Sequence, residues 1–223
     1  MYEIDGKRVY TELAELVEPS HTALIVIDMQ KDFCSRDGSF AKQGLDLSAY
    51  ESMVPRLAKL LDAARSFGVT VIHLQMTTLP GHRVESPAQI RFNMLQRPVG
   101  GTEPVSVVYT VEGTEGHQII PELSPMASEF IVPKYRSSGF WGTNLDMILG
   151  SNGLETVIVT GCTTEGCVES TARDALFNDY YVVVAEDCVA SDLPEQHEAS
   201  LVLMRKRFDV ATSDAICAAW QAR

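Results

Sequence analysis

Six short stretches of mostly apolar and often β-branched residues recur along the chain. Their hydrophobicity is nearly continuous and does not alternate, which is typical of strands covered on both faces. We expect strands at 22–28, 69–75, 129–134, 156–161, 180–187 and, with a weaker pattern, 209–213.

Two segments between these stretches carry apolar residues at helical spacing. In residues 50–68, Pro55 fits only the first turn of a helix and Gly68 is a suitable terminator. Residues 164–179 form the second segment. The apolar stripes are Val54, Leu57, Leu61 and Ala64 in the first segment, and Val168, Thr171, Ala172, Ala175 and Leu176 in the second.

The alternation of strands and helices predicts an α/β fold in three layers, α/β/α, with an open, mainly parallel six-stranded sheet in the middle. We expect one domain over residues 1–223, because no repeat, low-complexity tract or linker divides the chain. Residues 76–127 hold much of the glycine and proline and no strong core strand. Long segments of this kind often carry function, so we expect a partly ordered lid or substrate wall there.

Composition and charge narrow the class of partner. The net charge of −12, without an extended Lys and Arg cluster, argues against nucleic acid. No apolar run is long enough to span a bilayer, and the first residues do not resemble a signal peptide, so we expect no membrane partner. The five cysteines form no C-x-x-C pair, which fits a reducing cytosol. We therefore expect a cytoplasmic protein that binds a small molecule.

Three residues of complementary chemistry lie at the carboxyl ends of predicted strands, where ligands bind in open parallel sheets. Asp28 ends the first strand, Lys134 ends the third, and the chain after the fourth runs through a turn to Cys167. Each alone has an ordinary interpretation: an Asp that caps a turn, a Lys that reaches solvent, and a Cys that packs as a small apolar residue. Together they indicate a reactive site.

Cys167 is predicted in or near the first turn of a helix, where backbone N–H groups and the helix dipole stabilise a thiolate. The Lys134 ammonium would lower the thiol pKa further, and Asp28 could accept the thiol proton. The backbone N–H groups of Thr163 and Cys167 could face the oxygen of a tetrahedral intermediate. Cys162 lies in the turn itself and is assigned to packing.

Four ordered blocks of sequence resemble the isochorismatase-like cysteine hydrolases over roughly residues 21–216. The blocks read ALIVIDMQKDF, EGTEGHQIIPELSP, VPKYRSSGFWGTNLDMIL and VIVTGCTTEGCVESTARDA. The resemblance implies a six-stranded parallel sheet and a catalytic triad of Asp28, Lys134 and Cys167. It also implies a non-proline cis peptide before Thr163.

Within this superfamily, nicotinamidase-type members bind a metal through an Asp-x-His and a later His after the second strand. That place here reads HLQMTTLPGH, without Asp-x-His, so we expect no metal and no cofactor. The sequences TTLPGH and GCTTEGC are more similar to those of the metal-free amidases of the N-carbamoylsarcosine, ureidoacrylate and maleamate type. The resemblance thus implies a cysteine-dependent amidohydrolase that cleaves a C–N bond through a thioester.

Five residues are candidates for substrate contacts. Phe33, Phe140 and Trp141 could wall the pocket, while His82 and Arg83 could bind a carboxylate of the substrate. Phe140 and Trp141 could equally belong to the core. His82 and Arg83 could equally belong to a surface loop.

Two other functions stay open at this point. Vinyl-ether hydrolysis of isochorismate needs Asp28 as an acid and no nucleophile, and superfamily members that cleave it can lack the cysteine. A non-catalytic ligand-binding or thiol-sensing module would have Cys167 oxidised and not acylated. The family commonly forms dimers or tetramers, so we expect a homo-oligomer, in which a neighbouring subunit could complete the pocket.

Overall fold

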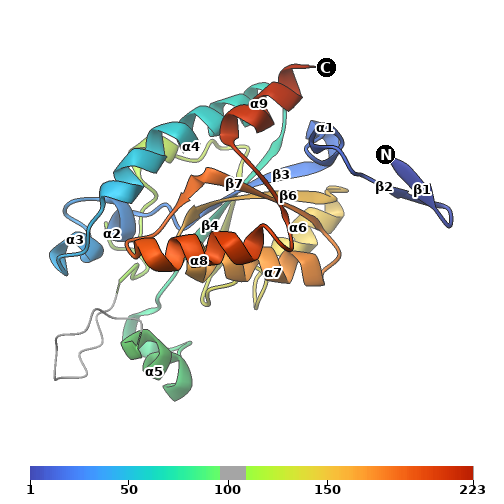
Figure 1. The fold of residues 1–223 in the computed structure, drawn as a ribbon. Coiled ribbons are helices and arrows are strands. Elements are labelled where there is room, and N and C mark those ends of the chain that lie inside the picture. Colours follow the sequence, from blue (N-terminus) through green and yellow to red (C-terminus); the bar gives the residue numbers. More distant parts are fainter. Residues whose placement is uncertain (96–108, 223) are drawn as a thin grey trace.

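The computed structural model describes residues 1–95 and 109–222, and six strands of that part form one parallel sheet (Figure 1). The strand order is β5-β4-β3-β6-β7-β8. The strands are β3 (Thr22–Ile27), β4 (Thr70–Met76), β5 (Phe130–Lys134), β6 (Thr156–Cys162), β7 (Tyr181–Ala190) and β8 (Asp209–Ala211). The α/β fold with a six-stranded parallel sheet, predicted from the sequence, is confirmed.

Helices cover both faces of the sheet (Figure 1). One face carries α1 (Leu13–Leu16), α4 (Ser48–Ser66) and α9 (Ser213–Gln221), and the other carries α6 (Leu145–Ser151), α7 (Glu169–Phe177) and α8 (Pro194–Met204). Outside these layers lie an antiparallel hairpin of β1 (Tyr2–Ile4) and β2 (Lys7–Val9), and three short helices, α2 (Lys31–Cys34), α3 (Ser39–Lys42) and α5 (Pro87–Leu95). No helix in the described ranges has the length and apolar character needed to cross a bilayer.

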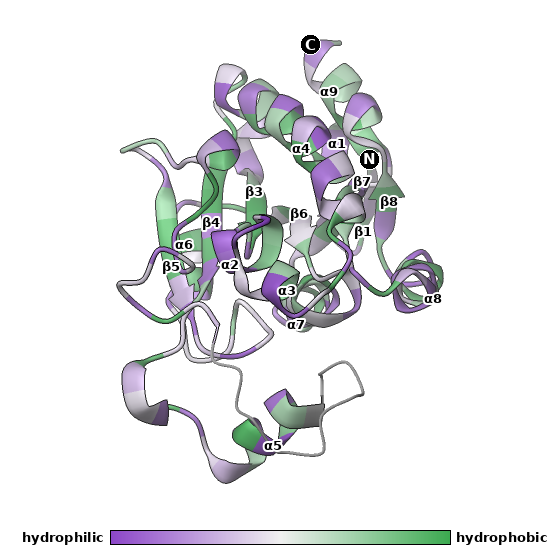
Figure 2. Ribbon diagram, turned by 90° about the vertical axis from the view of Figure 1, so that its left-hand side faces the viewer, coloured by the Kyte–Doolittle hydropathy of each residue, from purple (hydrophilic) through white to green (hydrophobic). Residues whose placement is uncertain are grey.

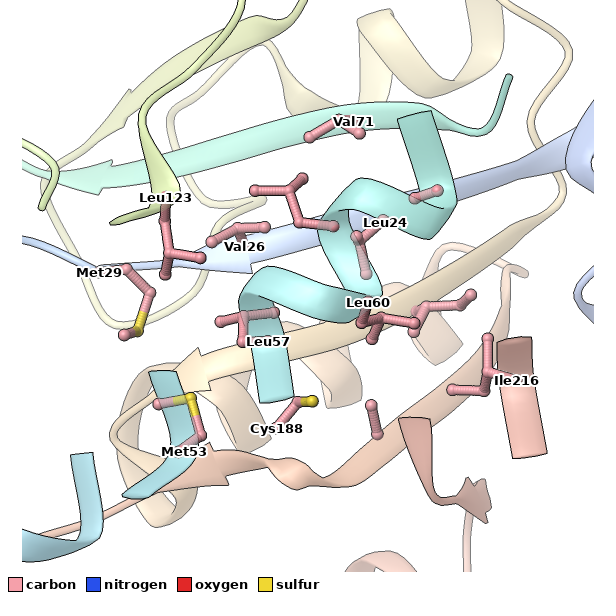
Figure 3. Close-up of a cluster of buried hydrophobic side chains, with 14 of the residues drawn as sticks. Leu24, Val26, Met29, Met53, Leu57, Leu60, Val71, Leu123, Cys188 and Ile216 are labelled. Carbon is pink, nitrogen blue, oxygen red and sulfur yellow. The ribbon is translucent and has the colours of Figure 1, made fainter. Parts of the chain in front are cut away.

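The core has two halves because successive strand residues point to opposite faces of the sheet. Leu24 and Val26 of β3 pack toward Leu57 and Leu60 of α4 (Figure 3), whereas the alternate residues of β3 pack on the opposite side. Burial of each such side chain contributes about 1.5–3 kcal/mol. Figure 2 shows hydrophobic residues concentrated along β3 and β4, while α4 and α8 mix hydrophobic and hydrophilic ones. Both faces of the central strands are thus buried, as their continuous hydrophobicity predicts.

The start of α4 differs from the prediction. The helix begins at Ser48, whose backbone N–H donates to the Asp46 carboxylate at 2.9 Å, so Pro55 lies in the helix interior. The prediction that Pro55 occupies the first turn is therefore wrong. Because Pro55 has no N–H, the Glu51 carbonyl one turn earlier lacks the usual intrahelical partner.

The end of α4 follows the prediction. Gly68 has a left-handed backbone with φ of 72°, and the N–H of Val69 reaches back to the Ala64 carbonyl at 2.9 Å. This is the glycine-terminated helix end typical of globular proteins. In α7, by contrast, the predicted apolar stripe is wrong at Leu176, which is 39% exposed because it lies near the solvent-facing end of the helix.

Gly161 allows β6 to lie close against β3. It has a φ of 102°, and a Cβ there would lie 2.1 Å from the carbonyl oxygen of Ile27. We expect Gly161→Ala to lower the free energy of unfolding by about 3 kcal/mol, because the methyl group both clashes and disfavours this backbone conformation. Urea denaturation measures the change. Gly150→Ala in α6 is the control, since its Cβ meets no atom within 4 Å, and equal stability of the two variants would contradict the prediction.

Residues 76–127 were predicted to form a lid or substrate wall. The chain leaves β4, enters α5, and from residue 109 onward returns beside the segment after β3, where Lys31 N–H donates to the Gln118 carbonyl at 2.9 Å. Residues 96–108 lie outside the described part of the chain, so the predicted partial order of this segment is not tested there. The lid or wall role and the single-domain boundaries stay predictions.

Candidate active site

The order of strands creates a crevice at the carboxyl edge of the sheet. After β3 the chain adds β4 and β5 on one side, and it then returns to add β6, β7 and β8 on the other. Ligands of open α/β sheets bind where the order reverses in this way. Asp28 directly follows β3, Lys134 ends β5, and Cys167 lies in the turn that follows β6.

Asp28 has an unusual backbone that fixes its carboxylate. Its φ is 54°, in the left-handed region that short polar residues tolerate better than most. The residue is 1% exposed, and its Oδ1 accepts a hydrogen bond from the backbone N–H of Met76 at 3.0 Å. The carboxylate is therefore held beneath the surface of the crevice.

Lys134 lies between the other two residues. It is fully buried, with its Nζ 2.8 Å from Asp28 Oδ2 and 3.2 Å from Cys167 Sγ. The ammonium also donates to the Arg136 carbonyl at 3.0 Å. Lys134 is thus turned inward, and it does not reach solvent as a lone strand-terminal lysine would.

Cys167 lies in a wide π-type turn, η4 (Thr164–Val168), that leads into α7. The peptide bond between Cys162 and Thr163, just before this turn, is cis. The Cys167 thiol hydrogen-bonds to Asp28 as well as to Lys134. The structure therefore brings Asp28, Lys134 and Cys167 into mutual contact.

The electrostatics of Cys167 differ from the prediction. Burial, together with the negative charge of Asp28, raises the pKa of the Cys167 thiol to about 12, and Lys134 offsets only part of this. Burial also raises the pKa of Asp28 despite the neighbouring ammonium. Burial lowers the pKa of Lys134, but Asp28 and Cys167 outweigh it and the net shift is upward. These shifts oppose the predicted stabilisation of a thiolate, and they favour a neutral thiol beside the Asp28–Lys134 ion pair in the resting site.

A cavity of about 670 Å³ opens above these residues. Asp28, Thr163 and Cys167 line its floor, and Phe33 lines a wall. Phe33 packs edge-on against Phe40 at 4.9 Å between ring centroids, and this makes the wall aromatic. Of the five predicted substrate contacts, Phe33 is the one that the described cavity lining includes.

His82 and Arg83 are not part of the described lining. His82 Nδ1 lies 2.6 Å from Glu85 Oε2, and Arg83 Nε donates to the Pro80 carbonyl at 3.1 Å. Both side chains are thus engaged within their own loop. The structure does not bring them to the cavity, so it gives a carboxylate-binding role for them no support.

Phe140 and Trp141 are also not among the described residues of the lining. Phe140 packs against the core and meets Tyr180 at 5.9 Å between ring centroids. Trp141 is 63% exposed and lies beneath the Arg136 guanidinium, 5.2 Å from the ring centroid. The prediction that these two aromatic residues wall the pocket is not met, because their rings face the core and the solvent.

Several lining residues were not predicted from the sequence. Asp192 and Leu193 follow β7, so the rule that led to Asp28 could have found them had it been applied to that strand. Residues of α3, α5 and the segment after α3 carry no such signal, because only the folded chain brings them over the sheet edge. The described lining that sequence reasoning missed includes Phe40, Asp46, Met76, Gln89, Phe92, Asn93, Tyr109, Glu165, Asp192, Leu193 and Gln196.

No group of three or more His, Cys, Asp or Glu side chains in residues 1–95 and 109–222 is arranged to hold a metal ion. The expectation of a metal-free site therefore stays a prediction from the sequence.

Comparison with known proteins gives the family. The family model described as the isochorismatase domain matches residues 22–215. A ureidoacrylate amidohydrolase RutB from Rhizobium rhizogenes is 32% identical over 212 residues, which is 91% of this chain and 84% of that protein. These matches span nearly the whole chain.

Solved structures agree. A cysteine hydrolase from Pseudomonas syringae pv. phaseolicola has a TM-score of 0.78 at 26% identity, covering 93% of this chain and 95% of that one. The N-carbamoylsarcosine amidase from Thermoplasma acidophilum has a TM-score of 0.67 at 29% identity, covering 86% and 96%. By fold, family model and sequence identity, this chain belongs to the isochorismatase-like superfamily.

Proposed function

We propose that the chain is a cysteine-dependent amidohydrolase that cleaves a C–N bond of a small amide, carbamoyl or ureido compound. The chain belongs to a hydrolase family, and its relatives are amidohydrolases. This supports the general part of the proposal, that it hydrolyses amide C–N bonds. The observation that supports the cysteine mechanism is the position of Lys134 Nζ, 2.8 Å from Asp28 Oδ2 and 3.2 Å from Cys167 Sγ, beneath the cavity.

In the first half of the reaction, the Cys167 sulfur attacks the carbonyl carbon of the bound amide. Asp28 takes the thiol proton as the S–C bond forms, and its raised pKa makes it a better base than an ordinary carboxylate. Backbone N–H groups of Thr163 and Cys167 stabilise the oxyanion. The C–N bond then breaks, and the leaving nitrogen takes the proton back from Asp28.

In the second half, water resolves the thioester. Asp28 accepts a proton from the water molecule while the water oxygen attacks the acyl carbon, and a second tetrahedral intermediate forms. The C–S bond breaks and the thiolate recovers the proton from Asp28. Lys134 stays protonated throughout, since its pKa is raised, and it stabilises both the Asp28 carboxylate and the sulfur as negative charge moves between them.

The two alternative functions have less support. A thiol sensor needs a thiolate that oxidants can reach, whereas the Cys167 pKa is raised to about 12. Vinyl-ether hydrolysis needs no nucleophile. It therefore gives no role to Cys167, which contacts both Asp28 and Lys134. Neither alternative is favoured by a specific contact of the described site.

Ammonia release from a panel of small amides, ureido acids and carbamoyl acids tests the proposed function. Wild-type protein should turn over at least one compound, and Cys167→Ala should turn over none. Isochorismate is assayed in parallel. If its vinyl ether is hydrolysed and no compound of the panel releases ammonia, the amidohydrolase proposal fails.

The pH dependence of kcat/KM follows from the pKa shifts. Asp28 must be ionised to accept the thiol proton, so activity falls as pH drops through its pKa, which burial raises above the ordinary value of 3.8. Because the Cys167 pKa is about 12, kcat/KM should not rise as pH passes about 8.5, where an ordinary thiol ionises. A pH profile of initial rates measures both features. A steep rise in kcat/KM through that range would contradict the neutral resting thiol.

A further inference from the structure

The turn that carries Cys167 packs against a neighbouring helix. The turn η4 has a wide, π-type conformation, which is rare and is often found at functional sites. Helix α8 packs directly against it, and two residues at the start of α8, Leu193 and Gln196, also line the cavity. Side chains of α8 that reach η4 can therefore fix where the turn holds the nucleophile.

One side chain of α8 makes a direct hydrogen bond to the turn. His197 Nδ1 lies 2.8 Å from the hydroxyl oxygen of Thr164, the first residue of η4. Thr164 is fully buried, so its hydroxyl group cannot exchange this partner for water. Loss of the bond would leave a buried polar group unpaired, which is unfavourable. The bond therefore favours one position of the turn relative to α8.

A contact from the same side of α8 holds the residue that follows the turn. Ser200 lies three residues after His197, and its hydroxyl donates to Glu169 Oε2 at 2.5 Å. The backbone N–H of Glu169 in turn donates to the Thr164 carbonyl. Helix α8 thus contacts the first residue of η4 and the first residue of α7, one at each end of the turn.

Thr164 lies between the parts of the turn that the proposed mechanism uses. Thr163, whose N–H is assigned to the oxyanion, directly precedes it, and Cys167 follows three residues later. The Cys167 thiol hydrogen-bonds to both Asp28 and Lys134, which come from other strands. A displacement of Thr164 would therefore move the oxyanion N–H groups and the thiol relative to that ion pair. Displacements of this kind can lower rates strongly even when they begin outside the reacting groups.

His197 itself is not among the described residues that line the cavity. Its side chain is 21% exposed, and its Nε2 lies 4.0 Å from Glu198 on the same helix. Thr164 is likewise outside the described lining. An effect of His197 on the reaction would thus pass through the turn.

We propose that His197 is a positioning residue for the amidohydrolase reaction. Through its hydrogen bond to Thr164, it fixes η4 so that the Cys167 thiol faces the ion pair and the oxyanion N–H groups face the substrate carbonyl. This inference rests on the proposed function. It makes the rate depend on a hydrogen bond between two residues outside the described lining of the cavity.

Paired substitutions remove or keep this hydrogen bond. His197→Leu removes the ring nitrogen, whereas His197→Asn places an amide oxygen or nitrogen close to the position of Nδ1. Thr164→Val removes the hydroxyl with little change in volume, whereas Thr164→Ser keeps it. Val202→Ala, at an exposed position of α8, is the control. Urea denaturation checks that each variant is folded, and if His197→Leu is not, the Thr164 pair carries the same test.

Iodoacetamide reports on the position of Cys167 without a known substrate. It is itself a small amide, and it alkylates the thiol as an S–C bond forms, iodide leaves and Asp28 takes the proton. Intact-mass spectrometry followed by digestion gives the rate of alkylation at Cys167. The fully buried Cys188 is the internal reference, because a general loosening of the fold would expose it to the reagent.

We expect His197→Leu and Thr164→Val each to slow the alkylation of Cys167 by about tenfold. His197→Asn, Thr164→Ser and Val202→Ala should stay within about twofold of the wild type, because they keep the bond. The double variant His197→Leu with Thr164→Val should be no slower than the slower single variant, since both changes remove the same interaction. Cys188 should stay unmodified in all of them.

Hydrolysis gives a second measurement for any amide that the panel shows to be a substrate. Its kcat should fall by about 10–100-fold in His197→Leu and recover in His197→Asn. Its dissociation constant, measured by NMR titration in the Cys167→Ala background, should change by less than about threefold on adding His197→Leu, because His197 acts on the reacting groups and not on the cavity walls.

Several results would overturn the positioning role. They are wild-type alkylation and kcat in His197→Leu, equal losses in His197→Leu and His197→Asn, losses that multiply in the double variant, and alkylation of Cys188 in the slow variants. The two proposals fail separately. If no amide releases ammonia but alkylation follows the expected pattern, the positioning of Cys167 is supported and the proposed function fails. If wild type and His197→Leu hydrolyse amides equally well, the positioning role alone fails.

Discussion

Cys167→Ala should lower kcat for amide hydrolysis by at least about 10⁴-fold, because it removes the atom that forms the covalent intermediate. The fold should survive, since the substitution removes one sulfur atom whose described hydrogen bonds join it to Asp28 and Lys134. Ammonia release measures the rate, and circular dichroism during urea denaturation measures stability. Loss of activity with an unchanged unfolding transition is the expected result.

Cys217→Ala is the matched control for this experiment. Cys217 is a buried thiol in α9, outside the described lining of the cavity, and its replacement should change kcat by less than about twofold. If Cys167→Ala retains hydrolysis within about tenfold of the wild type, the thioester route is wrong. Acid catalysis by Asp28 alone, as in vinyl-ether cleavage, would then be favoured.

Asp28→Asn should lower both activity and stability. The amide cannot accept the thiol proton, so kcat should fall by about 10²–10⁴-fold. The change also leaves the fully buried Lys134 ammonium without its counter-charge, which should lower the free energy of unfolding by about 3–5 kcal/mol. Steady-state rates and urea denaturation measure the two effects.

A double variant separates the two effects of Asp28. Adding Lys134→Met to Asp28→Asn removes the unpaired charge and fills the site with an apolar chain of similar length. The stability lost in the single variant should return in large part, while the activity should not. If the Asp28→Asn protein is as stable as the wild type, the Lys134 ammonium does not need Asp28 as a counter-charge. That result would contradict the description of the two residues as a buried ion pair.

Sequence patterns were sufficient for the sheet because its central strands are covered on both faces. Continuous apolar runs such as the one ending at Asp28 have few structural alternatives, and the rule on carboxyl ends then brings Lys134 and Cys167 to the same edge. The helix details were less predictable. Pro55 and Leu176 were misplaced because local spacing does not reveal where a helix begins or which end faces solvent.

The pKa of Cys167 could not be predicted from neighbours alone. A lysine and a helix start favour a thiolate, but desolvation and the charge of the neighbouring Asp28 carboxylate oppose it more strongly. Burial is a property of the packed chain and has no local signature. For the same reason His82 and Arg83 were assigned to the substrate, although Glu85 and Pro80 engage them within their loop.

Direct observation of an acyl group on Cys167 tests the central claim. Intact-mass spectrometry of wild-type protein quenched in acid during turnover should show an adduct equal to the substrate minus its leaving amine, and digestion should place it on Cys167. Hydroxylamine added during turnover should intercept the same thioester and yield the hydroxamate of the substrate acid. Rapid hydrolysis with neither adduct nor hydroxamate, or with the acyl group on another cysteine, would contradict the proposed mechanism.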